Sequence, residues 1–223
     1  MIFSPDLAPL IGPHPSLRNY HLAVGVMAGF NQGAGIGQAL AQWIVEGEPG
    51  TDLSDWDVAR FGPWADRRYT EATTRYFYEN RSERSYPAQE HPAGRPVRVT
   101  PVHERLAAAG AVFGASFGLE HPNWFAPPGT TAEDRPSFDA PNWWAPVAAE
   151  GRLIRESAAL MEYSAIAKLR VSGPGAAAWL DALLPCRLPA EGRVRLTPML
   201  SGRGRVIGDL TVTRLGGAFL LLS

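Results

Sequence analysis

Three runs rich in branched apolar residues near the C-terminus constrain the fold more than any other feature of the sequence. They cover residues 194–200, 206–215 and 218–222, and each has the composition of a β-strand. Short glycine-containing segments connect them, Ser201-Gly-Arg-Gly204 and Gly216-Gly217, and such segments favour tight reversals of the chain. The pattern therefore predicts an antiparallel sheet built from consecutive hairpins.

Helical periodicity appears on the N-terminal side of this sheet. One helix is expected to end at Gly47, with a buried face made of Ile36, Leu40, Trp43 and Ile44. A second is expected over residues 102–109, with Thr100 as its N-cap, Pro101 at its first position and Gly110 after its end.

Two further helices and two strands complete the expected elements. A helix over 146–160 is predicted to bury Val147, Ile154, Ala158 and Met161. A helix that follows Ser172 is predicted to bury Trp179, Leu180 and Leu183. Strands are expected at 20–26 and 168–171, so the fold class is α+β with antiparallel strands.

Composition narrows the class of protein. The 223 residues are 45% hydrophobic, which is enough to build a core, and the net charge of −1 favours neither nucleic acid nor a membrane surface as a partner. Cys186 is the single cysteine, so neither a disulfide framework nor a cysteine-based zinc site is expected. His103 and His121 have no companions at metal-ligand spacing, so no metal is expected. No membrane span and no signal peptide are expected either.

A glycine-rich segment follows the expected strand at 20–26. Its last part reads Gly33-Ala-Gly-Ile-Gly37, and this G-x-G-x-G spacing differs from the G-x-G-x-x-G of a dinucleotide-binding turn. Two interpretations remain open from the residues alone. The glycines either allow close packing at a strand-to-helix turn, or present backbone N–H groups to a flat flavin ring.

The order of short motifs along the chain resembles that of a known family. Residues 4–6, 28–37 and 60–61 resemble the C-terminal end of an FAD-dependent amine oxidoreductase domain. Residues 94–96 and 118–126 resemble the central connecting domain of the same enzymes. Residues 172–175 and 208–212 resemble the start of a folate-binding domain like that of aminomethyltransferases, the T-protein of glycine cleavage. The chain thus resembles part of an FAD-dependent dimethylglycine/sarcosine dehydrogenase, with domains at 1–61, 62–141 and 142–223.

This resemblance implies two coupled reactions of one-carbon metabolism, in the catabolism of glycine betaine. FAD would oxidise an N-methyl group of a small methylated amine by hydride transfer, and tetrahydrofolate would take up the one-carbon unit. An electron-transfer flavoprotein or oxygen would accept the electrons. The expected location is the bacterial cytoplasm, or the mitochondrial matrix in a eukaryote. The resemblance also implies that an upstream part holds most of the FAD and that this chain is a fragment. Two alternatives stay open, a folate-dependent aminomethyltransferase without redox activity and a remnant without catalysis.

Two groups of site residues follow from the resemblance. Asp209 matches the catalytic carboxylate of the folate domain, where it would stabilise a cationic intermediate, whereas the residues alone also allow a solvated carboxylate. The predicted flavin contacts are Gly29, Asn31, Gln32, Gly33, Gly35, Ile36 and Gly37.

Overall fold

The computed structural model describes residues 3–27 and 29–223, and the chain forms two compact units. The first unit ends at Leu160, and the second runs from Met161 to Ser223. Each unit has its own cluster of buried apolar side chains. Ala28, which begins the glycine-rich motif, lies outside the described residues.

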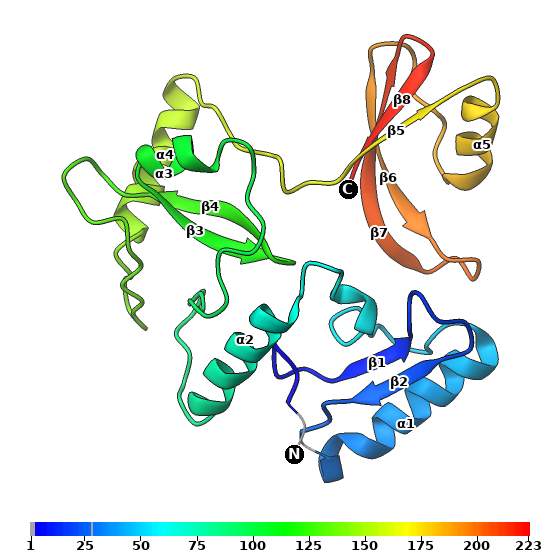
Figure 1. Ribbon diagram of the computed structural model, residues 1–223. Helices are drawn as coiled ribbons and strands as arrows, with labels where there is room; N and C mark the ends of the chain where they lie inside the picture. Colours follow the sequence, from blue (N-terminus) through cyan, green and yellow to red (C-terminus); the bar gives the residue numbers. More distant parts are fainter. Residues whose placement is uncertain (1–2, 28) are drawn as a thin grey trace. The chain divides into compact units, whose positions relative to one another are not determined.

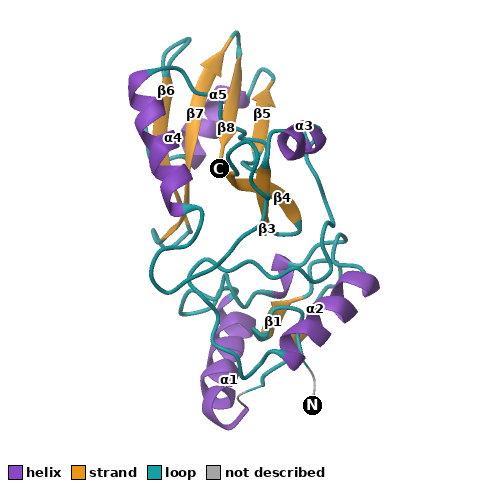
Figure 2. Cartoon of the chain, turned by 90° about the vertical axis from the view of Figure 1, so that its left-hand side faces the viewer, coloured by secondary structure: helices purple, strands orange, loops and turns teal. Residues whose placement is uncertain are grey.

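The second unit is built on the predicted antiparallel sheet (Figures 1 and 2). Its strands are β5 (Lys168–Ser172), β6 (Val194–Leu200), β7 (Val206–Leu215) and β8 (Ala218–Leu222), in the order β5-β8-β7-β6. All three pairings are antiparallel, and the C-terminal runs 194–200, 206–215 and 218–222 are strands with the predicted bounds.

Helix α5 (Ala176–Leu183) packs its apolar residues on one face of this sheet. Leu180 and Val212 are fully buried in the cluster, and Phe219 and Leu221 of β8 complete it. Because side chains alternate along a strand, the burial of Leu210 and Val212 turns Asp209, Thr211 and Thr213 to the other face.

The N-terminal part of the first unit is a small hairpin covered by a long helix. Strands β1 (Leu10–Pro13) and β2 (His21–Val24) pair antiparallel, and α1 (Gly29–Glu46) contacts both (Figure 1). Gly12 has φ of +111°, and a Cβ there would stand 2.7 Å from the Trp43 ring, so glycine at this position lets α1 approach β1.

The rest of the first unit combines the two helices predicted near residues 102–109 and 146–160 with a turn, a helix and a hairpin that the sequence pattern did not predict. The 3-10 turn Val58–Arg60 (η1) precedes α2 (Arg67–Glu79), whose N-cap Asp66 accepts a hydrogen bond from the Tyr69 N–H at 2.8 Å. Strands β3 (Ala111–Ser116) and β4 (Leu119–Phe125) form a hairpin. Helices α3 (His103–Ala108) and α4 (Trp144–Glu156) contact β4.

Several helix predictions were wrong about which residues are buried. Ile44, Ile154, Trp179 and Leu183 are each more than half exposed. Helix α4 ends at Glu156, so Ala158 and Met161 lie beyond it, and Val147 is 38% exposed. The α3 N-cap is Val102 rather than Thr100. Apolar spacing identifies a helical face, but it does not say whether the chain supplies a partner to cover that face.

The α+β class with antiparallel strands is confirmed. The domain boundaries at residues 61 and 141 stay predictions beside the contact-based division at Leu160. Among the described helices, none has both the length and the apolar character that crossing a bilayer requires. Within residues 3–27 and 29–223, no three His, Cys, Asp or Glu side chains gather closely enough to hold a metal ion.

Candidate functional site

The predicted flavin contacts lie in the first three turns of α1. The strand-to-helix turn expected at residues 33–37 is not there, because the helix already begins at Gly29. In an α-helix only the first four N–H groups lack an intrahelical acceptor, so residues from Gly33 onward do not present free backbone donors. The backbone donors available for a ligand are therefore limited to the start of the helix.

The glycines of this segment face open space. A Cβ at Gly29, Gly33, Gly35 or Gly37 would meet no atom of the described residues within 4 Å. Close packing inside this unit therefore does not explain why these positions are glycine. Phe30, beside them, is fully exposed. Gly29, Gly33 and Gly37 recur every four residues and so lie along one side of α1, the open face, whereas Gly35 is exposed on another side of the helix.

The other predicted contacts divide between this open face and the interior. Asn31 is exposed and Gln32 is half-buried, so their amide groups remain available for hydrogen bonds. Ile36 is buried, with Ala39, on the side of α1 that covers the hairpin. The side chain of Ile36 therefore belongs to the core of the first unit and not to the open face.

Asp209 stands on the polar face of β7, opposite Pro198 of β6. Its side chain is exposed, and among the described residues no donor bonds its carboxylate. Its backbone oxygen accepts a hydrogen bond from Ser223 Oγ at 3.3 Å. The sheet thus holds the backbone of Asp209 while the carboxylate stays free to meet a cationic group.

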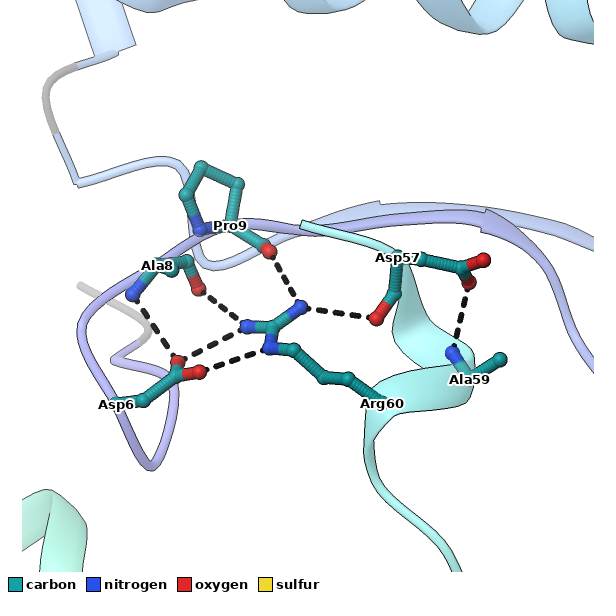
Figure 3. Close-up of polar contacts among 6 residues, drawn as sticks. All are labelled: Asp6, Ala8, Pro9, Asp57, Ala59 and Arg60. Carbon is teal, nitrogen blue, oxygen red and sulfur yellow. Dashed lines mark hydrogen bonds and ion pairs between the residues drawn. The ribbon is translucent and has the colours of Figure 1, made fainter. Parts of the chain in front are cut away.

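Arg60 ties the segment before β1 to the turn at η1 (Figure 3). Its Nε and Nη2 donate to the two carboxylate oxygens of Asp6 at 2.8 and 2.9 Å. Its remaining N–H groups donate to the backbone oxygens of Ala8, Pro9 and Asp57 at 3.0–3.1 Å. Because all five N–H donors are engaged and the side chain is 8% exposed, Arg60 is a structural clamp.

A second arginine clamp joins the segment after α2 to the β3–β4 hairpin. Arg95 donates from Nε and Nη2 to the Glu120 carboxylate at 2.8 and 2.6 Å, and from Nη2 to the Phe113 carbonyl at 2.8 Å. The Glu120 side chain is 5% exposed, so this is a buried ion pair. The hydrogen bond to Glu120 raises the pKa of Arg95 above its ordinary value.

Neither clamp follows from the local sequence pattern, although the residues of both lie in the family motifs. Asp6 and Arg60 belong to the flavin-domain motifs, and Arg95 and Glu120 belong to the connecting-domain motifs. The partners are 54 and 25 residues apart, so no local spacing rule could pair them. Of the predicted site residues, those of α1 share one helix, whereas Asp209 belongs to the other unit.

Two family models match consecutive parts of the chain. The model of the FAD dependent oxidoreductase central domain matches residues 46–100, and that of the GCVT N-terminal domain matches residues 102–223.

Similar proteins align with nearly the whole chain. Human mitochondrial dimethylglycine dehydrogenase is 37% identical over 99% of the chain. The 4-methylaminobutanoate oxidase (formaldehyde-forming) of Paenarthrobacter nicotinovorans is 36% identical over 96%, and mouse mitochondrial sarcosine dehydrogenase is 34% identical over 96%. The chain spans 26% of the length of each of these relatives.

The GCVT model alone covers more than half of the chain, and the matched models follow the order expected from the motifs. The family resemblance drawn from the sequence is therefore confirmed. The chain belongs to the GCVT N-terminal domain family, where it corresponds to the region of the dimethylglycine and sarcosine dehydrogenases in which an FAD dependent oxidoreductase central domain precedes that domain.

Proposed function

We propose that this chain is part of an FAD-dependent oxidoreductase that oxidises an N-methyl group of a glycine derivative and passes the one-carbon unit to tetrahydrofolate. The observation that carries the proposal is the alignment of 99% of the chain with human dimethylglycine dehydrogenase, across both matched domains. The chain spans about a quarter of that relative, so the activity is proposed for the parent protein and not for this region alone.

The open face of α1 fits a flavin. A flat ring can approach a helix surface closely only where side chains are absent. Gly29, Gly33 and Gly37 leave one side of α1 bare, and the predicted contact at Gly35 lies on another side of the helix. Asn31 and Gln32 supply amide groups for the polar edge of the ring. Bound FAD would supply hydride acceptance, and α1 would orient it from one side while an upstream part holds the remainder.

Asp209 fits the role of a carboxylate in the tetrahydrofolate region. Its free, exposed carboxylate on a rigid strand can orient an amine and stabilise positive charge that develops during transfer. Bound tetrahydrofolate would supply the nitrogen that takes up the one-carbon unit. The polar face of β7 would present Asp209 to it, with Thr211 and Thr213 beside it.

The substrate is a small N-methylated amino acid, and the relatives provide a panel for testing it. We expect dimethylglycine or sarcosine to reduce the flavin of the parent protein under anaerobic conditions. 4-Methylaminobutanoate belongs in the same panel, because a relative that is 36% identical is named for it. If none of the three amines bleaches the flavin absorbance, the proposed substrate class is wrong.

The electron acceptor and the location belong to the same proposal. Electrons pass to an electron-transfer flavoprotein or to oxygen, and peroxide formation by the reduced protein in air separates the two. The mitochondrial relatives support the mitochondrial matrix for a eukaryotic protein, and the bacterial cytoplasm is the corresponding location otherwise.

Asp209→Asn in the parent protein tests whether Asp209 serves one-carbon capture and not amine oxidation. Flavin reduction should remain near the unmodified rate, whereas tetrahydrofolate-dependent capture should fall by about 100-fold, the scale seen when one electrostatic stabiliser is removed. Formaldehyde release should rise correspondingly. Asp181→Asn, on the exposed side of α5, is the matched control. Equal loss of both activities would mean that Asp209 serves the fold.

A folate-dependent aminomethyltransferase without redox activity is the second candidate, because the GCVT model covers the larger share of the chain. It requires a parent protein that is colourless and still transfers a one-carbon unit to tetrahydrofolate. A colourless parent protein that transfers nothing would instead support a remnant without catalysis.

A further inference from the structure

A cavity in the first unit is lined by charged and aromatic side chains that the proposed chemistry does not use. Its volume is about 200 Å³, room for about six water-sized groups. Asp6, Arg60, Tyr69, His91 and Arg95 form its polar lining. These residues come from the N-terminal segment, η1, α2 and the segment after α2, so the cavity exists only in the folded unit.

The charged side chains of this lining differ in how completely they are hydrogen-bonded within the chain. Arg60 has no N–H to offer, and its bidentate pair neutralises Asp6. Arg95 holds Glu120 and the Phe113 carbonyl through Nε and Nη2, whereas its Nη1 has only long contacts. These are to the His91 carbonyl at 3.4 Å and to a Glu90 oxygen at 3.6 Å. Nη1 of Arg95 is therefore the guanidinium nitrogen with capacity for a further acceptor.

Tyr69 and His91 add neutral polar groups beside Arg95. Burial, with the Asp6 charge, raises the pKa of Tyr69, while the Arg95 charge acts in the other direction. The phenol therefore keeps its proton and can donate. Burial and the Arg95 charge lower the pKa of His91, and its Nδ1 is buried without a hydrogen-bond partner among the described residues. A buried polar atom without a partner indicates that a ligand or water completes the site.

The remaining lining residues are apolar. Phe61, Trp64 and Phe117 contribute aromatic side chains, of which Phe117 is largely exposed at the rim. A Cβ at Gly118 would stand 2.4 Å from the Trp64 ring, and one at Gly94 would stand 3.0 Å from the Tyr69 ring. Both glycines have positive φ, so these contacts depend on glycine. Trp64 and Tyr69 are therefore held in place, which makes the cavity a preformed one.

We propose that this cavity binds a small monocarboxylate with a short apolar body, whose carboxylate bonds Arg95 and Tyr69 while its apolar part lies against the aromatic walls. An arginine with a spare N–H next to a phenol is suited to a carboxylate, because both groups donate. A ligand of about six non-hydrogen atoms matches the volume of the cavity.

Sodium propionate and n-propylammonium chloride are probes of matched size and opposite charge. Each is titrated calorimetrically into the full chain at constant ionic strength. We expect saturable propionate binding with a dissociation constant on the order of 1 mM, because so few atoms can contribute. No saturable heat is expected for propylammonium. Propionate should also raise the thermal midpoint of the chain relative to equal sodium chloride.

Tyr69→Phe is the decisive variant, since it removes the hydroxyl and keeps the ring contact with Trp64. Propionate affinity should fall about tenfold or more, the effect of one hydrogen bond to a charged group. Tyr78→Phe is the matched control on α2, because Tyr78 does not line this cavity. Ala115→Leu fills the cavity from β3 and should abolish binding while circular dichroism shows that the fold is kept.

Three results would overturn the proposal. The first is the absence of saturable propionate binding by the unmodified chain. The second is propylammonium binding in place of propionate, which would assign the cavity to the Asp6 carboxylate. The third is equal propionate affinity in Tyr69→Phe and Tyr78→Phe. If Ala115→Leu does not fold, the comparison of Tyr69→Phe with Tyr78→Phe still tests the proposal.

Discussion

The polar residues in the motifs of this chain have one of two roles, stabilising the fold or taking part in chemistry. The hydrogen bonds and burial of each side chain show which role it has. Arg60 and Arg95 lie in motifs of the family, yet their guanidinium groups are mainly engaged within the first unit. Asp209 lies in a motif as well, but no described donor bonds its carboxylate. A polar group that is fully bonded and buried stabilises the fold, whereas one that is held by its backbone alone is available for chemistry.

Replacing Arg60 with alanine tests the clamp. The change removes the guanidinium donors of three backbone oxygens and of the Asp6 carboxylate, so the unfolding free energy should fall by about 3 kcal/mol. Arg67→Ala is the control, because its pair with Glu71 is exposed and its loss should leave the unfolding free energy nearly unchanged. Urea unfolding followed by tryptophan fluorescence measures both. Similar losses in the two variants would contradict a structural role for Arg60.

His91 should make stability depend on pH. Burial lowers its pKa in the folded chain below the unfolded value of about 6.5, so the unfolded chain takes up a proton first as the pH falls. The contribution of neutral His91 to the free energy of unfolding is complete above about pH 6.5 and is lost progressively as the pH falls below that value. Urea midpoints between pH 7.5 and 5.5 should therefore decline less steeply in His91→Gln than in the unmodified chain. His21→Gln, on β2, controls for removal of an imidazole elsewhere, and an unchanged slope in His91→Gln would refute the assignment.

At the level of elements, the sequence pattern predicted the bounds of the C-terminal strands more accurately than those of the helices. β6, β7 and β8 have the predicted bounds because period-two alternation and the glycine turns are local features. The helix α1 begins earlier than its glycine content suggests, since each glycine weakens a helix by about 1 kcal/mol relative to alanine. Burial of Ile36 and Ala39 against the first hairpin accompanies this early start, and tertiary packing of this kind outweighs propensity.

Two glycine replacements distinguish the open face of α1 from its packed side. Gly33→Ala should stabilise the chain by up to about 1 kcal/mol, because a Cβ there meets nothing and alanine favours the helix. Gly12→Ala should destabilise it, because the Cβ would overlap Trp43 and φ is +111°. Thermal unfolding checks both. In the parent protein, Gly33→Ala should also weaken flavin binding, and unchanged flavin affinity would count against the proposed contact.

At the level of the whole molecule, the chain combines two units whose hydrophobic clusters share no residue. The cluster of the second unit joins α5 to β7 and β8, and that of the first unit lies on the β3–β4 hairpin. Many large apolar side chains are exposed, among them Phe30, Leu160 and Val206. The chain also spans 26% of its relatives, and the activity proposed here belongs to that larger protein.

Leu180→Ala should weaken the second unit specifically. Leu180 is fully buried, so its truncation should cost about 3 kcal/mol through lost transfer energy and the cavity left behind. Leu183→Ala, on the same helix and 56% exposed, should cost well under 1 kcal/mol. Hydrogen exchange should show lost protection in β7 and β8 for Leu180→Ala alone. Equal effects of the two leucines would mean that α5 buries a different face.

The sequence by itself determined the features that depend on near neighbours. These are the antiparallel C-terminal sheet and the order of family motifs. Alternation, turn chemistry and motif order are all readable along the chain.

The tertiary structure alone decided the rest. It paired Arg60 with Asp6 and Arg95 with Glu120, and it assembled the cavity from segments far apart in the chain. It also left Ile44 and Leu183 exposed although their spacing matched a buried face. Burial and long-range pairing depend on which distant segments meet, and that meeting is a property of the folded chain that local periodicity does not encode.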